Sequence, residues 1–136
     1  MEEESKNFFL GDSYLFKKVL LIINELEHEF KDIKIKVIKS HSLMDSFPPM
    51  YATGCQLDFV DLKFAVSIQT NSEIAGPAFC ETALIEKEKG VIYEKELGYD
   101  DCIRHDSEED LKEHLKMLFQ KLPTYKTHEN NDHNQK

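Results

Sequence analysis

The chain has little of what disulfide-rich, membrane-spanning or phosphate-binding proteins depend on. It holds 3 cysteines, 5 glycines and no tryptophan in 136 residues. Cys55, Cys80 and Cys102 are widely spaced and odd in number, so we expect no disulfide framework. So few glycines leave no phosphate-cradling glycine loop. No apolar run approaches the roughly 18 residues that a membrane-spanning helix needs.

Positive charge is also scarce. Lys and Arg together number 17 against 26 acidic residues, which gives a net charge of −9, and Arg104 is the only arginine. This balance argues against nonspecific binding to nucleic acid or to an anionic membrane. The acidic start at residues 1–6 is unlike a secretory signal, so we expect a cytoplasmic protein. A lysine-rich, arginine-poor composition is typical of AT-rich coding sequences, and an origin in a phage or another mobile element is one expectation.

Apolar side chains at helical spacing predict one helix over residues 13–30 and a second over 107–122. Asp12 or Ser13 can cap the first helix, and Ser107 with Asp110 forms a capping-box pattern for the second. Pro123 is expected to stop the second helix. The two apolar stripes consist of Leu15, Val19, Ile22, Leu26 and Phe30, and of Leu111, Leu115, Leu118 and Leu122.

Alternating polarity between these helices predicts strands, four of which pair as two hairpins, with Gly90 at the second turn. The expected fold class is α+β, a two-layer sandwich in which both helices cover one face of an antiparallel sheet of about five strands. The predicted strands span residues 33–39, 56–60, 64–69, 78–86 and 91–95, with a short segment at 102–105. The opposite sheet face is expected to be solvated and to carry Lys34, Lys36, Asp58, Ser67 and Glu81.

This pattern predicts a single domain over residues 12–123. Residues 1–11 are expected to form a flexible acidic arm, and residues 124–136 a disordered polar tail.

The segment 40–54 is too apolar to be only a connection. Loops of this length are uncommon in small domains and are often functional, and disordered segments are poor in apolar residues. Pro48 and Pro49 exclude a helix interior or a central strand. The segment therefore either closes the core or presents an apolar surface to a partner. The partner-binding residues that it predicts are Leu43, Met44, Phe47, Met50 and Tyr51.

A second candidate surface is acidic and surrounds the single arginine. Its members are Asp100, Asp101, Arg104, Asp106, Glu108 and Glu109. Helix capping and turns account for several of these carboxylates, and the functional interpretation is a patch that docks a basic partner. A calcium loop would need a glycine at its sixth position, which the stretch from Asp100 lacks.

No pattern in the chain defines a catalytic or metal site, so we expect no cofactor and treat an enzyme as the minority interpretation. Cys102 and His105 lie three residues apart, which places them on opposite faces of an extended strand. His41 has Ser42 and Asp45 as neighbours, but residues so close in sequence cannot easily adopt triad geometry.

The sequence thus favours a small acidic binding protein, such as an inhibitor, an immunity protein or an adaptor. Two alternatives stay open. One is a small-molecule or nucleotide binder, or a minor enzyme, that uses Tyr99, Arg104 and His105 as its polar lining. The other is a self-associating structural subunit, for instance a homodimer.

Overall fold

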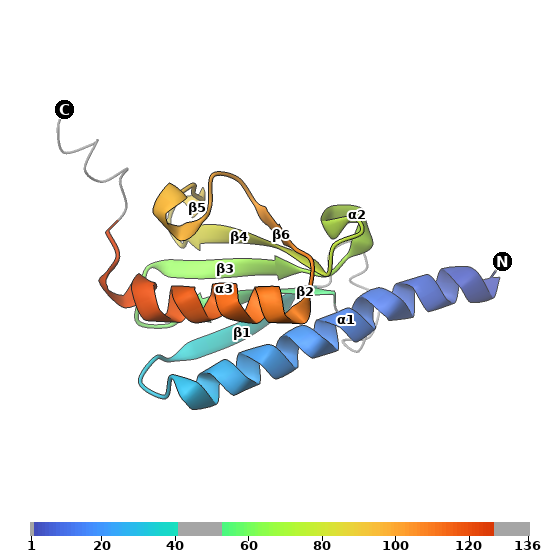
Figure 1. The fold of residues 1–136 in the computed structure, drawn as a ribbon, viewed down its shortest axis with the longest axis horizontal. Coiled ribbons are helices and arrows are strands. Elements are labelled where there is room, and N and C mark those ends of the chain that lie inside the picture. Colours follow the sequence, from blue (N-terminus) through green and yellow to red (C-terminus); the bar gives the residue numbers. More distant parts are fainter. Residues whose placement is uncertain (1, 41–52, 127–136) are drawn as a thin grey trace.

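The computed structural model describes the backbone of residues 2–40 and 53–126, with side chains from Tyr14 onward except those of Ser40 and Glu73. Two long helices enclose a run of strands in the chain (Figure 1). The elements are α1 (Glu2–Glu29), β1 (Ile35–Ser40), β2 (Gly54–Phe59), β3 (Phe64–Gln69), α2 (Ser72–Ala75), β4 (Cys80–Glu86), β5 (Gly90–Val91), η2 (Lys95–Leu97), β6 (Ile103–His105), α3 (Glu108–Lys121) and η3 (Leu122–Thr124).

The strands form one antiparallel sheet of six strands in the order β1-β2-β3-β4-β5, with β6 also paired to β4. The register pairs Val37 with Leu57, Leu57 with Val66 and Val66 with Leu84. Because directly paired residues share a face of the sheet, these four apolar side chains form one row across it. This row forms the side of the core that the sheet contributes.

Both long helices cover this apolar face (Figure 1). Leu26 of α1 and Leu118 of α3 are fully buried, as is Phe119, whose ring meets the ring of Phe59 of β2 edge-on at 5.1 Å. Three ion pairs join the helices, Lys18–Glu108, Glu25–Lys112 and Glu29–Lys116. Residue numbers increase along both helices from one pair to the next, so α1 and α3 run in the same direction.

The predicted α+β fold, with its antiparallel sheet and two helices on one face, is confirmed. The cap on the second helix is confirmed as well, since the Asp110 amide donates to Ser107 Oγ at 3.1 Å. Pro123 ends α3 as an α-helix, but the chain continues for one further turn as η3.

The first helix is longer than its apolar stripe. It begins at Glu2 and not at residue 13, so the backbone of the predicted arm is helical. Asp12 and Ser13 consequently lie within the helix and not at its start. The stripe marks only the part that packs in the core, where residues from Phe16 to Leu26 are buried and Leu15 and Phe30 are partly buried against them. The preceding part of α1 projects beyond the end of the sheet (Figure 1).

The second hairpin is shorter than predicted. Residues 91–95 were expected to be a strand, but β5 ends at Val91, and beyond it the Ile92 amide donates to the Leu84 carbonyl of β4 at 3.0 Å. The chain then turns at η2, which ends at Gly98 with a φ of 85°, a left-handed conformation that favours glycine. This turn brings Tyr99 back beside Glu94. Gly90 has the positive φ expected of it, 89°.

Candidate functional site

One end of the sheet holds both ends of the apolar segment and part of the acidic patch. Ser40, the last residue of β1, pairs with Gly54, the first residue of β2, so the segment between them leaves and rejoins the sheet at one place. Thr70, just after β3, holds the residue that precedes β2. Its amide and its hydroxyl donate to the Thr53 carbonyl at 2.7 and 2.9 Å. The predicted binding residues Leu43, Met44, Phe47, Met50 and Tyr51 lie outside the described residues.

Part of the acidic patch lies at this same end. The carboxylates of Asp106, Glu108 and Glu109 are on exposed residues where β6 passes into α3 (Figure 1). Asp100 and Asp101 are exposed too, but they precede β6 and lie away from the start of α3. The five acidic residues of the patch are thus divided between the two ends of β6, and Arg104 is the middle residue of that strand.

Arg104 has a structural role within this region. Its guanidinium donates to Glu81 Oε2 at 3.1 Å and to the Ile74 carbonyl at 2.9 Å, which fastens α2 to the sheet. Gly76 allows this approach: it has a φ of 64°, and a Cβ there would meet Arg104 Nη1 at 3.0 Å. Arg104 therefore faces α2, whereas His105 beside it in β6 turns into the core.

Beneath the start of α3 lies a buried chain of polar side chains, which we call the imidazole chain. It runs from Asp110 Oδ2 to His105 Nδ1 (3.2 Å), from His105 Nε2 to Thr82 Oγ1 (2.9 Å), on to the Tyr99 hydroxyl (2.8 Å) and then to His114 Nε2 (2.9 Å). Thr82 and Tyr99 are each 1% exposed and His105 is 2% exposed. The chain joins β4, β6, α3 and the turn after η2.

Burial shifts the acidity of several of these groups. It lowers the pKa of His105, against the attraction of Asp110. It lowers the pKa of His114 to about 4, and the nearby His105 contributes in the same direction. Burial also raises the pKa of the Tyr99 phenol. At neutral pH both imidazoles are therefore uncharged, and the phenol keeps its proton.

The Asp110–His105–Thr82 part of the chain has the connectivity of a hydroxyl-activating triad. Its hydroxyl is nevertheless out of reach of any substrate, because Thr82 is 1% exposed and is also bonded to Tyr99. An enclosed, fully hydrogen-bonded chain is what buried polar groups need for stability. Tyr99 and His105 belong to it while Arg104 does not, so the three residues do not line one pocket.

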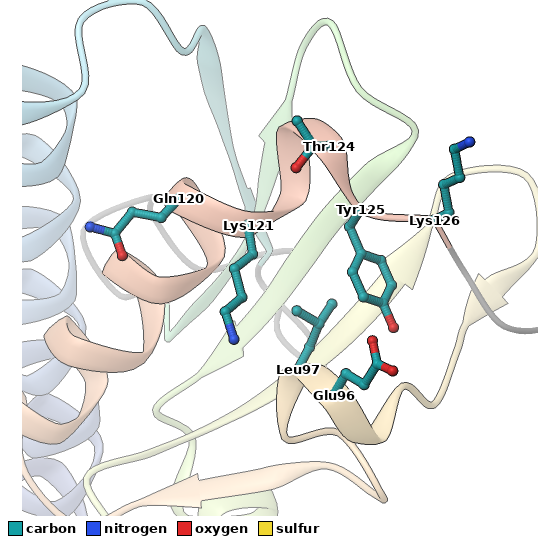
Figure 2. Close-up of a pocket in the computed structure, with 7 residues that line it drawn as sticks. All are labelled: Glu96, Leu97, Gln120, Lys121, Thr124, Tyr125 and Lys126. Atoms are coloured by element: carbon teal, nitrogen blue, oxygen red, sulfur yellow. The ribbon is translucent and has the colours of Figure 1, made fainter.

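A hollow lies at the opposite end of the sheet, beside the end of α3. It has a volume of about 400 Å³. Figure 2 shows the Leu97 side chain between Lys121 and Tyr125, with the Glu96 carboxylate near the Tyr125 ring. The Tyr125 hydroxyl donates to the buried Glu94. Gln120, Thr124 and Lys126 complete the lining, so the hollow is open and mostly polar.

The described residues contain no group of three or more His, Cys, Asp or Glu side chains suited to a metal ion. Cys55 and Cys80 are buried, and burial raises the pKa of each thiol to about 12. Cys102 is exposed while His105 is buried, consistent with their placement on opposite faces. No helix in the described part of the chain is long and apolar enough to cross a membrane.

Sequence reasoning missed two members of the imidazole chain, Thr82 and His114. Both carried a usable signal. Thr82 alternates with Cys80 and Leu84 on the buried face of β4, and His114 lies within the apolar stripe of α3, next to Leu115. A polar residue on an otherwise apolar face needs a partner, and these two reach the same partner, Tyr99.

Comparisons with known proteins found no match among protein-family models, curated proteins or solved structures.

Proposed function

We propose that this protein acts by binding a protein partner and not by catalysis. In this proposal the partner contacts the end of the sheet where residues 41–52 connect β1 to β2. The apolar anchors are Leu43, Met44, Phe47, Met50 and Tyr51.

The observation that supports this proposal most is the pairing of Ser40 with Gly54. It places the two ends of the apolar segment 41–52 on neighbouring strands, β1 and β2. Binding residues are often found on segments held in this way by a rigid scaffold. The hydrogen bonds from Thr70 to Thr53 also link the end of β3 to the residue where the segment ends.

Charge supports a partner with a basic surface. Asp106, Glu108 and Glu109 are exposed at the same end of the sheet. Protein interfaces combine a few apolar anchors with a polar rim, and an acidic rim suits basic side chains on the partner. The net charge of −9 would speed the encounter with such a partner.

The accessible chemistry supports binding over catalysis. The one triad-like arrangement in the described residues has a buried hydroxyl, and the hollow of Figure 2 lies at the other end of the sheet.

The test compares the double variant Phe47→Ala/Tyr51→Ala with Tyr93→Ala, which removes an aromatic side chain that is 60% exposed. We expect the wild-type chain and Tyr93→Ala to retain one partner from the native lysate, and the double variant to lose it with an unchanged melting temperature. Retention of that partner by the double variant would refute the proposal. So would a loss of about 3–5 kcal/mol of stability, the cost of truncating core aromatics.

Two further measurements address the alternative functions. A rise in melting temperature with one member of a metabolite panel would favour a ligand-binding protein, since a ligand of the native state raises its apparent stability. A stable dimer in size-exclusion chromatography with light scattering would favour a self-associating subunit.

A further inference from the structure

The imidazole chain has one consistent direction when both histidines are neutral. An ionised Asp110 can only accept, so His105 Nδ1 carries the hydrogen and His105 Nε2 must accept. Thr82 then donates to His105, Tyr99 donates to Thr82, and His114 donates from Nε2 to the Tyr99 oxygen. Every hydrogen bond points towards Asp110, and both tautomers are thereby fixed.

A proton added to His105 is accommodated without the loss of a hydrogen bond if the chain reverses. His105 Nε2 then donates to Thr82, Thr82 donates to Tyr99, and Tyr99 donates to His114 Nε2. The hydrogen of His114 must move to Nδ1. A proton added to His114 at Nδ1 is simpler, because Nε2 keeps donating and the original direction stands.

A second proton costs a hydrogen bond. With both rings charged, His105 Nε2 and His114 Nε2 both donate into the chain, so the hydroxyl hydrogen of Thr82 or of Tyr99 loses its acceptor within the chain. Both residues are 1% exposed, so water does not replace that acceptor. Two charged rings would also lie with centroids 5.0 Å apart in the protein interior. The geometry therefore favours the first proton over the second.

We propose that His105 and His114 form a single-proton site, in which the folded protein takes up one proton shared between the two imidazoles. A second proton separates α3 from the sheet. This proposal does not depend on the proposed function, although Asp106 belongs both to the acidic rim and to the charges that face the two rings.

The charges that face this site favour the first proton. Asp110 contacts His105 from α3, and Asp106 lies just beyond β6. The other groups that face the rings, the thiol of Cys80 on β4 and the phenol of Tyr99, are neutral because burial raises their pKa. Both carboxylates favour the proton on His105, whereas His114 has only Asp110 in its favour and is opposed by a charged His105.

Protonation of the buried His105 would change the charge at the exposed start of α3. Protonation of His105 places a positive charge directly behind Asp110 in the exposed first turn of α3. The turn then carries less net negative charge, and the three hydrogen bonds that link His105, Thr82, Tyr99 and His114 reverse direction. A rise in acidity is thereby transmitted from the core to the start of α3.

The experiment is a pH titration of the ¹⁵N-labelled full chain, with imidazole nitrogens observed by long-range ¹H–¹⁵N correlation from pH 7.5 to 3.5. His105→Gln and His114→Gln assign the signals. At pH 7.5 we expect hydrogen on Nδ1 of His105 and on Nε2 of His114. Below pH 6.5 one net proton enters the pair while the amide spectrum stays folded. The second enters about two pH units lower, from the repulsion of two charges 5.0 Å apart at an effective dielectric constant of about 20. The amide signals of α3 should leave their folded positions as it enters, and a second proton taken up with those signals unchanged would contradict the proposal.

Tyr99→Phe provides the matched test of coupling, because it removes the hydroxyl that joins the two halves of the chain. In this variant the tautomer of His114 should no longer depend on the charge of His105. Thr82→Ser keeps the hydroxyl and should preserve the coupling, which covers the case that Tyr99→Phe fails to fold. The proposal is overturned if both imidazoles protonate in the same interval with the folded spectrum intact, if neither protonates before unfolding, or if the two tautomers at pH 7.5 are the opposite ones.

Discussion

Replacing Tyr99 by phenylalanine tests whether the imidazole chain holds the two layers of the protein together. The change removes one hydroxyl and leaves the ring, which is 1% exposed, in place. Two hydrogen bonds are lost, the bond to Thr82 at 2.8 Å and the bond to His114 at 2.9 Å.

The size of the effect follows from what each partner loses. Thr82 is 1% exposed and loses a donor to its oxygen, but it can still donate to His105. His114 loses the acceptor for Nε2, and because it is only partly buried, water can replace part of that bond. Leaving a buried polar group unsatisfied costs about 1–3 kcal/mol, so we expect a loss of about 2 kcal/mol in the free energy of unfolding.

The assay is urea unfolding followed by far-ultraviolet circular dichroism, with Tyr93→Phe as the control. Tyr93 is 60% exposed, so its hydroxyl is already solvated and its removal should change stability by no more than about 0.5 kcal/mol. The slope of the unfolding free energy against urea should be unchanged in both variants. Equal stabilities of Tyr99→Phe and Tyr93→Phe would refute the reasoning, since the buried chain would then contribute nothing to the fold.

Three further predictions concern other parts of the structure. Stability should fall as the pH drops from 6.5 to about 4, because the pKa of His114 is 6.5 when unfolded and about 4 when folded, so the unfolded chain binds the proton first. Urea midpoints across this range should show the fall, and it should be smaller in His114→Gln. Gly76→Ala should destabilise the protein more than Gly90→Ala in thermal unfolding: both positions have positive φ, but only at Gly76 does a Cβ meet another group, Arg104 at 3.0 Å. Tyr125→Phe should cost about 1–2 kcal/mol in urea unfolding, because it removes the donor to the buried Glu94, and a neutral result would show that this bond does not stabilise η3.

The arrangement of layers could be predicted because it depends on residue spacing. The stripe from Val19 to Leu26 and the alternation in β2 and β3 specify which side of each element is apolar, and one core can satisfy both. The N-cap at Ser107 is a local interaction and was predictable for that reason. The start of α1 was not predictable from the stripe, since helical backbone continues beyond the residues that pack.

The imidazole chain could be anticipated only in part. Tyr99 and His105 were candidates as polar residues near the acidic stretch, but their connection passes through Thr82, more than 15 residues from either in sequence. The pairing of β6 with β4 creates that contact, and a three-residue strand such as β6 has too few positions to reveal its register. Arg104 faces the other way because neighbouring strand residues alternate.

Site-specific photo-crosslinking tests the central claim of partner binding most directly. A photoreactive phenylalanine analogue would replace Phe47 in one variant and the exposed Tyr93 in another, and each would be irradiated in native lysate. We predict a single defined covalent adduct with another protein from position 47 and none from position 93, competed by excess unlabelled wild-type chain. The absence of an adduct at position 47, or the same adduct at both positions, would contradict the assignment of the partner-binding surface to the segment between β1 and β2.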